Sequence, residues 1–62
     1  MATPISERIM LSKQWHNDKR KRVKLVELVD RLHRKWYIIM IGSRVISRTE
    51  SLTEAKRMYQ DY

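Results

Sequence analysis

A dense basic segment between Lys19 and Lys35 is the first feature of this sequence with the chemistry to bind a ligand. It holds eight Lys or Arg residues and two acids, so it carries six of the seven net positive charges of the 62-residue chain. Clustered cations suit phosphate groups, because each neutralised phosphate releases counterions. We therefore expect a nucleic-acid-binding surface made of the basic residues of this segment, its one histidine and two arginines beyond it: Lys19, Arg20, Lys21, Arg22, Lys24, Arg31, His33, Arg34, Lys35, Arg44 and Arg48.

The same charge pattern has plainer interpretations. Runs of Lys and Arg often only solvate a surface or protect an exposed sheet edge, and a basic face also suits an acidic protein surface. The net charge of +7 thus predicts an anionic partner, either nucleic acid, with RNA ahead of DNA, or an acidic protein surface.

Aromatic residues are the second feature of interest, because aromatic rings beside Arg and Lys can stack on bases. Three are candidates for stacking or for anchoring a partner: Trp15, Trp36 and Tyr37. Neighbouring residues of a strand point to opposite faces. We therefore expect one of Trp36 and Tyr37 to pack in the core against Leu52 and Tyr59, and the other to face away from the helix. Trp15 either anchors a partner or covers the core.

The sequence shows no pattern typical of catalysis or metal binding. His16 and His33 are far apart and have no cysteine beside them, which makes a poor metal signal. Serines, histidines and acids occur without the glycine-rich turns that position a nucleophile or cradle a phosphate. We expect a non-enzymatic protein with no catalytic residues, no metal and no cofactor.

Length and composition point to one small intracellular domain. A chain of 62 residues buries only about 60% of its unfolded surface, so a partner or a homodimer could add stability. The absence of cysteine argues against a secreted, disulfide-stapled domain. The N-terminus lacks a signal-peptide pattern, and the apolar run from Trp36 to Ile41 is too short to span a bilayer. The expected location is the cytoplasm of a bacterium or an infected host cell, away from the membrane.

The C-terminal half gives the clearest structural signals. Ser51 and Glu54 fit a capping box, and apolar residues at helical spacing follow, which predicts a helix from about 52 to 61. Gly42 and Ser43 join two runs rich in aromatic and β-branched residues, which is typical of a tight hairpin.

The N-terminal half is less decisive. Residues 22 to 30 fit either a helix or a strand, and their valines favour a strand. Residues 1 to 18 precede a predicted domain at 19 to 62, and three structures fit them. They form a short helix that starts at Thr3-Pro4, with Ile5 and Ile9 facing inward, or a fourth strand from Arg8 to Trp15 that turns at 16 to 18. The third alternative is a flexible segment. The predicted fold class is α+β, a small antiparallel β-meander (22–29, 35–41 and 44–48, with a fourth strand left open) packed on one C-terminal helix.

Residues 36 to 59 combine an aromatic-led strand, a turn glycine, a return strand and a helix that opens with Ser-Leu-x-Glu-Ala. The pattern is carried by Trp36, Tyr37, Gly42, Ser51, Leu52, Glu54 and Ala55. It resembles the hairpin-plus-helix element of small accessory proteins of bacteria and their phages, over well under half of the chain. The resemblance implies a fold element and, through the phage association, an accessory role such as binding host RNA or blocking a host defence nuclease or toxin.

Two functional hypotheses follow. The first is a small, basic, non-catalytic nucleic-acid-binding protein, with RNA favoured because no helix motif for the major groove is evident and a sheet with aromatics and Arg suits unpaired strands. The alternative is a phage-type inhibitor or adaptor that docks its basic face on a host enzyme, such as a defence nuclease, a toxin or other nucleic-acid-processing machinery, with RNA as a bridge in one version. A peripheral membrane role ranks last.

Overall fold

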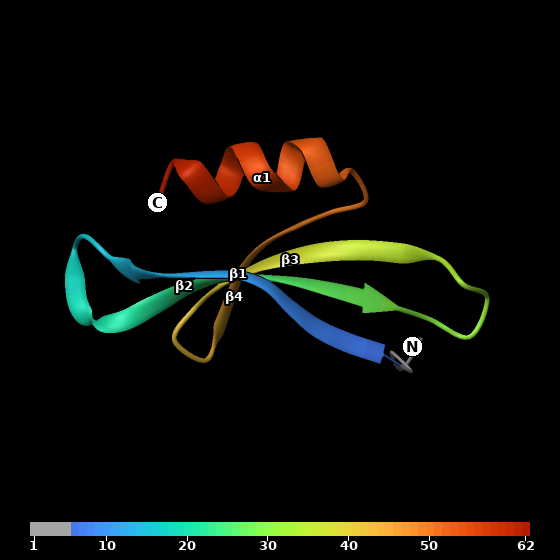
Figure 1. Cartoon of the computed structure of the whole chain (residues 1–62), viewed down its shortest axis with the longest axis horizontal. Helices are drawn as coiled ribbons and strands as arrows, with labels where there is room; N and C mark the ends of the chain where they lie inside the picture. The colour runs from blue at the N-terminus through green and yellow to red at the C-terminus, as the bar shows by residue number, and fades with distance from the viewer. Residues whose placement is uncertain (1–5) are drawn as a thin grey trace.

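The structure is a computed structural model that describes residues 6–62. It contains a four-stranded antiparallel sheet and one helix (Figure 1). The elements are β1 (Ser6–Trp15), β2 (Asp18–Val29), β3 (Lys35–Ile41), β4 (Arg44–Thr49) and α1 (Leu52–Gln60). The strands follow one another in the order β1-β2-β3-β4, so the predicted α+β meander with a C-terminal helix is confirmed.

The N-terminal segment supplies the fourth strand that the sequence left open. β1 pairs with β2 from Ser6 opposite Val29 to Trp15 opposite Asp18. The alternative helix is wrong where it can be checked, because Ile9 lies in β1, while Thr3, Pro4 and Ile5 fall outside the described residues. The expected boundary at residue 18 lies within the first hairpin, so residues 6 to 15 belong to the same sheet as the rest.

The turn and cap signals of the C-terminal half have the expected geometry, with one difference. Gly42 adopts a φ of +63°, a conformation that costs glycine little, and its N–H donates to the Arg22 carbonyl. Ser51 caps α1 by accepting from the Glu54 N–H at 3.3 Å. A capping box also predicts that the Ser51 N–H donates to the Glu54 side chain. This second bond is wrong, because the Ser51 N–H donates instead to Thr49 Oγ1 at 3.1 Å.

The main core lies between the sheet and α1. Six residues are buried there, from β2, β3 and the helix: Val23, Leu25, Tyr37, Ile39, Ala55 and Tyr59. The other helix positions predicted to face inward, Leu52, Met58 and Tyr62, pack against this cluster. Tyr37 is therefore the core member of the aromatic pair, and Trp36 lies on the opposite face, as the alternation of a strand requires.

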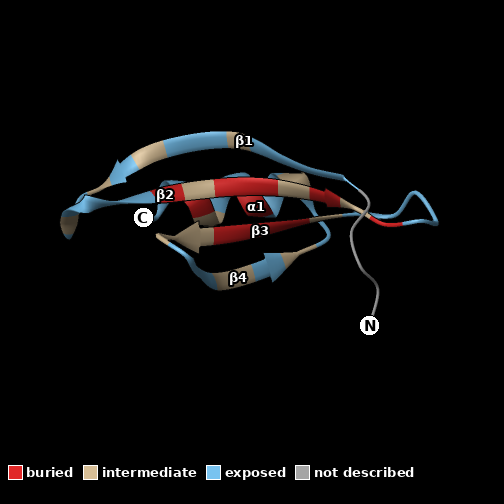
Figure 2. Ribbon diagram, turned by 90° about the horizontal axis from the view of Figure 1, so that it is seen from below, coloured by how far each residue is buried: buried red, intermediate tan, exposed pale blue. Residues whose placement is uncertain are grey.

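A second apolar cluster lies on the sheet face away from α1. Val26, Leu28 and Ile38 are buried there, and Trp36 and Met40 pack against them. Figure 2 looks at this face and shows buried residues along the middle of β2 and β3, between the more exposed strands β1 and β4. Strands with apolar residues on both faces read as nearly continuous apolar runs, which explains why the sequence of β3 does not alternate.

Candidate functional site

The first hairpin extends beyond the rest of the sheet as a two-stranded arm, residues 14–22. β2 and β3 pair only from Val23 onward, so the preceding residues of β2 have β1 as their only neighbouring strand. The turn at His16 and Asn17 brings the tip of the arm to the C-terminal end of α1 (Figure 1). There His16 Nδ1 lies 2.6 Å from the Tyr62 carbonyl oxygen. The arm therefore projects from the sheet while its tip is held against the helix.

Three consecutive cations bulge out of this arm. The register passes from Gln14 opposite Arg22 directly to Trp15 opposite Asp18, so the intervening residues Lys19–Lys21 have no partner on β1. We call these residues the basic bulge. The sequence analysis started this strand at residue 22, and the structure extends it back to Asp18, so all three residues lie within β2. A bulge bends its strand and changes the direction of its side chains, and all three side chains are exposed.

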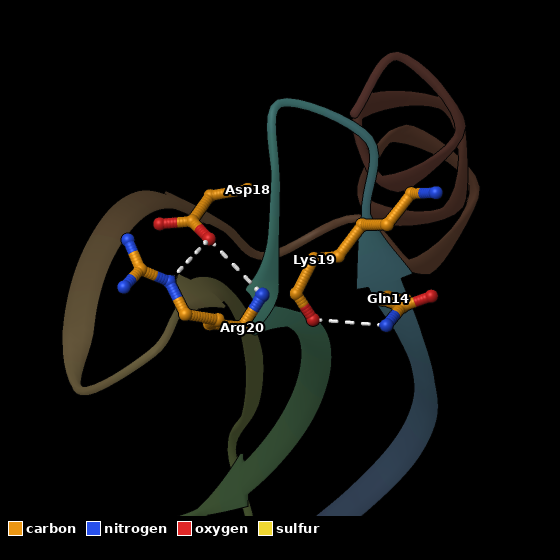
Figure 3. Close-up of polar contacts among 4 residues, drawn as sticks. All are labelled: Gln14, Asp18, Lys19 and Arg20. Carbon is orange, nitrogen blue, oxygen red and sulfur yellow. Dashed lines mark hydrogen bonds and ion pairs between the residues drawn. The ribbon is translucent and has the colours of Figure 1, made fainter.

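One uncharged residue, Gln14, and one acidic residue, Asp18, give the basic bulge its shape. Gln14 Nε2 donates to the Lys19 carbonyl at 2.9 Å, in place of a regular ladder bond (Figure 3). Asp18 Oδ1 accepts from the Arg20 N–H at 3.0 Å and lies 3.4 Å from Arg20 Nε. Arg20 is nevertheless 92% exposed along its side chain. Sequence reasoning did not single out Gln14 or Asp18, because their contacts exist only once the bulge has formed.

The first hairpin packs with one face against the main core and α1. Trp15 packs against the main core, which is the covering role that the sequence left as one of two, and its buried Nε1–H has no hydrogen-bond partner among the described residues. Lys13 Nζ lies 4.6 Å from the centroid of the Tyr59 ring. Burial raises the pKa of the Tyr59 hydroxyl, while the charge of Arg22 acts in the opposite direction.

A second basic cluster occupies the turn between β2 and β3. Asp30 is only 8% exposed, and its Oδ1 accepts from the Leu32 N–H at 2.8 Å and the Arg34 N–H at 2.9 Å. His33 adopts a φ of +60°, which is uncommon for a residue other than glycine but more frequent for histidine than for most. The side chains around this fixed backbone are all exposed: Arg31, Leu32, His33, Arg34 and Lys35.

The predicted basic surface is thus divided between the two ends of β2. Val29 is ten positions after Lys19 along β2, or roughly 30 Å away, in a molecule whose longest dimension is 37 Å. This exceeds the screening length of about 8 to 10 Å at physiological salt. The basic bulge and the turn at 30–34 therefore act as separate charged clusters, and the structure does not bring them into one patch.

The remaining predicted cations lie elsewhere. Arg44 follows the Gly42-Ser43 turn opposite Ile41, close to the inner end of the arm. Lys24 is opposite Met40 and Arg48 is opposite Ile38, both on the face away from α1. The Arg48 guanidinium lies over the Trp36 ring, 5.4 Å from its centroid. The ring of Trp36 is thus already partly covered by a cation of its own chain.

Residues 6–62 contain little that resembles another kind of site. No three His, Cys, Asp or Glu side chains gather in a way that could hold a metal ion. The described helix is too short and too polar to cross a bilayer. An open depression beside α1 is lined by Ser51, Thr53, Glu54, Arg57, Met58 and Asp61, and it contains no histidine or lysine to activate a hydroxyl.

Comparisons with protein-family models, with curated proteins and with solved structures gave no significant match. The resemblance of residues 36 to 59 to an element of bacterial and phage proteins therefore stays a prediction.

Proposed function

We propose that this protein binds nucleic acid without catalysing a reaction, and that RNA is its preferred ligand. The observation that carries the proposal is the basic bulge, in which three adjacent cations are exposed on a projecting arm and have no opposite residue on β1. Within residues 6–62, Asp18 is the acid that contacts this cluster. Phosphate binding supplies most sequence-independent affinity for nucleic acid, and closely spaced, directed cations are what such binding needs.

The preference for RNA over DNA rests on the surface of α1, which does not suit reading of the DNA major groove. A DNA-reading helix must present several side chains to base edges in the major groove. α1 packs one face on the sheet, and its exposed side mixes acidic and basic residues, Glu54, Lys56 and Arg57, with the acidic Asp61 directly after it. We therefore expect contacts to the backbone of unpaired or irregular RNA, in the cytoplasm, with little base preference.

Salt dependence tests the proposal directly. Three phosphate contacts on a single strand correspond to a slope of about −2 in a plot of log affinity against log salt, or about 20-fold weaker binding between about 50 and 200 mM salt. The measurement is fluorescence anisotropy with single-stranded RNA, single-stranded DNA of the same sequence and duplex DNA. We expect the tightest binding to RNA. Affinity that does not change with salt would contradict nucleic-acid binding, and tighter binding to duplex DNA would contradict the choice of RNA.

A second candidate function is that of a phage-type inhibitor or adaptor that docks its basic face on a host enzyme. The exposed cations of the basic bulge suit an acidic protein surface as well as phosphate groups. Nuclease treatment separates the two functions, because a protein complex that survives it would support the inhibitor or adaptor, and the loss of every protein partner would count against it.

A further inference from the structure

The sheet face away from α1, which we call the open face, has a polar half next to the arm. Arg22 is opposite Gln14 on β1. Lys24 is opposite Ser12 on β1 and Met40 on β3. Met40 packs against the apolar cluster of this face, so Lys24 lies on it as well, and so does Arg22, because alternate residues of a strand share a face. Arg22 Nε also donates to Ser12 Oγ at 2.9 Å. The open face therefore begins, at the arm, with two cations beside uncharged polar side chains.

The same alternation continues these cations into the basic bulge. Arg20 is two residues before Arg22, and its side chain contacts Asp18. Figure 3 shows the Asp18 and Arg20 side chains on one side of β2 and the Lys19 side chain on the other. Arg20, Arg22 and Lys24 therefore form a row on one side of β2, which we call the cation row. Successive members are about 6.6 Å apart along the strand, which is close to the spacing of successive phosphates in an extended single strand.

The other side of the arm faces α1. There His16 Nδ1 lies 2.6 Å from the Tyr62 carbonyl oxygen, and Trp15 packs against the main core. Lys13 Nζ lies 4.6 Å from the centroid of the Tyr59 ring. On the open face, by contrast, no helix of the described residues is present (Figure 2). A nucleic-acid strand that contacts the arm can therefore continue along the sheet on the open face without meeting α1.

In the described residues, the acids of the open face lie at the ends of the cation row or beyond them. Asp18 contacts Arg20 at 3.4 Å, and the Arg20 side chain remains 92% exposed. Glu7 is opposite Leu28, which is four positions after Lys24, or about 13 Å. This distance exceeds the screening length of about 8 to 10 Å at physiological salt. Glu7 therefore does little to weaken phosphate binding on the row.

We propose that an extended, unpaired strand of RNA runs along β2 on the open face, with successive phosphates on Arg20, Arg22 and Lys24. This inference rests on the proposed function, because it extends the site from the basic bulge onto the sheet. The row ends at Lys24, because Val26, the next residue of β2 on this face, is buried. Phosphate contacts supply sequence-independent affinity, so each added cation of the row should increase both the affinity and its dependence on salt.

The test neutralises the two cations of the row that lie outside the basic bulge. In Arg22→Gln/Lys24→Gln the slope of log affinity against log salt for single-stranded RNA should fall by about 1.4, with binding on the order of 25-fold weaker at about 0.1 M salt. The matched control Lys13→Gln/Lys56→Gln removes the same charge from β1 and α1 and should stay within about threefold of the wild type. Equal losses in the two variants would overturn the proposal.

A conservative variant separates phosphate binding from a structural role of Arg22. Arg22→Lys keeps the charge but loses the bond from Nε to Ser12, and it should bind RNA within about threefold of the wild type. Binding as weak as that of the Gln variant would show that Arg22 acts through the fold and would overturn its phosphate contact.

Failure of the proposed function is visible separately, in the unmodified protein. Affinity that does not change with salt contradicts RNA binding altogether. If the unmodified protein shows the expected salt dependence but Arg22→Gln/Lys24→Gln binds as tightly, only the cation row is wrong. NMR shifts of the labelled full chain then locate the RNA: we expect the largest shifts at Ser12, Lys24 and Met40, whereas shifts centred on Lys13 and Tyr59 would overturn the course along the open face.

Discussion

Asp18 and Asp30 stand at the two ends of β2, and each carboxylate accepts from the backbone N–H two residues later. The distances are 3.0 Å to the Arg20 N–H and 2.8 Å to the Leu32 N–H. Such contacts are typical of turns shaped by aspartate. The difference is burial, because the Asp18 side chain is 28% exposed whereas Asp30 is 8% exposed. The same local contact therefore shapes the exposed basic bulge at one end and stabilises a buried turn at the other.

The neighbouring cations differ between the two ends as well. In the arm four cations are consecutive, Lys19 to Arg22, and Gln14 and Asp18 shape the bulge. In the turn the cations are interrupted by Leu32 and His33 and surround a carboxylate that accepts two backbone N–H groups. The arm thus holds four cations in consecutive positions, whereas the three cations around the turn are interrupted. This difference is why we propose RNA binding at the arm.

Removal of Asp30 should have the largest effect. In Asp30→Ala the Leu32 and Arg34 N–H groups lose their acceptor, and partly buried donors without a partner cost about 1 to 3 kcal/mol each. We expect the free energy of unfolding to fall by about 2 to 4 kcal/mol in a denaturant titration. The matched variant Asp18→Ala should cost about 1 kcal/mol or less, because water can replace its exposed contact. Equal losses in the two variants would remove the distinction between the ends.

Gln14→Ala tests the shape of the basic bulge without changing its charge. The variant removes the bond to the Lys19 carbonyl, and a lost hydrogen bond of about 1 kcal/mol should weaken RNA binding by about fivefold. Anisotropy titration at fixed salt measures this change. The control is Gln60→Ala on the exposed side of α1, which should leave affinity unchanged. If Gln14→Ala also had no effect, charge alone would explain binding.

The smallest expected effect concerns the ionisation of the buried Tyr59 hydroxyl of α1. Burial holds the pKa of Tyr59 above its ordinary value of 10.0, so above about pH 10 the unfolded chain loses this proton before the folded chain does. Stability should therefore be complete below that pH and decrease as the pH rises further. Thermal midpoints of the wild type and Tyr59→Phe, measured across this range, should diverge above about pH 10. Parallel curves would show that the ionisation of Tyr59 makes no contribution to the pH dependence of stability.

Much of the fold could be predicted, because its signals are local. Gly42 at the hairpin, Ser51 at the start of α1 and the apolar spacing from Leu52 to Tyr62 each act within a few residues. β1 was harder to assign, because it is an edge strand with mostly exposed residues and its pairing with β2 is a long-range property. Its bulge at Met10 also interrupts the simple alternation.

The candidate site could be predicted only in part. Charge density identified residues 19 to 35, but it could not show that a 12-residue strand would place the two groups of cations at opposite ends. The basic bulge depends on a register shift between Gln14 and Trp15, and no pattern within β2 alone signals it. The alternation of Trp36 and Tyr37 was predictable, whereas the stacking of Arg48 on Trp36 required the register of β3 and β4.

The most direct test of the central claim compares two triple variants that each remove three positive charges. Lys19→Gln/Arg20→Gln/Lys21→Gln neutralises the basic bulge, and Arg31→Gln/Arg34→Gln/Lys35→Gln neutralises the other end of β2. In salt titrations with single-stranded RNA, the first variant should lose about 2 from the slope and bind on the order of 100-fold more weakly at about 0.1 M salt, whereas the second should stay within about threefold of the wild type. Equal losses in both variants would show that net charge, and not the basic bulge, determines binding.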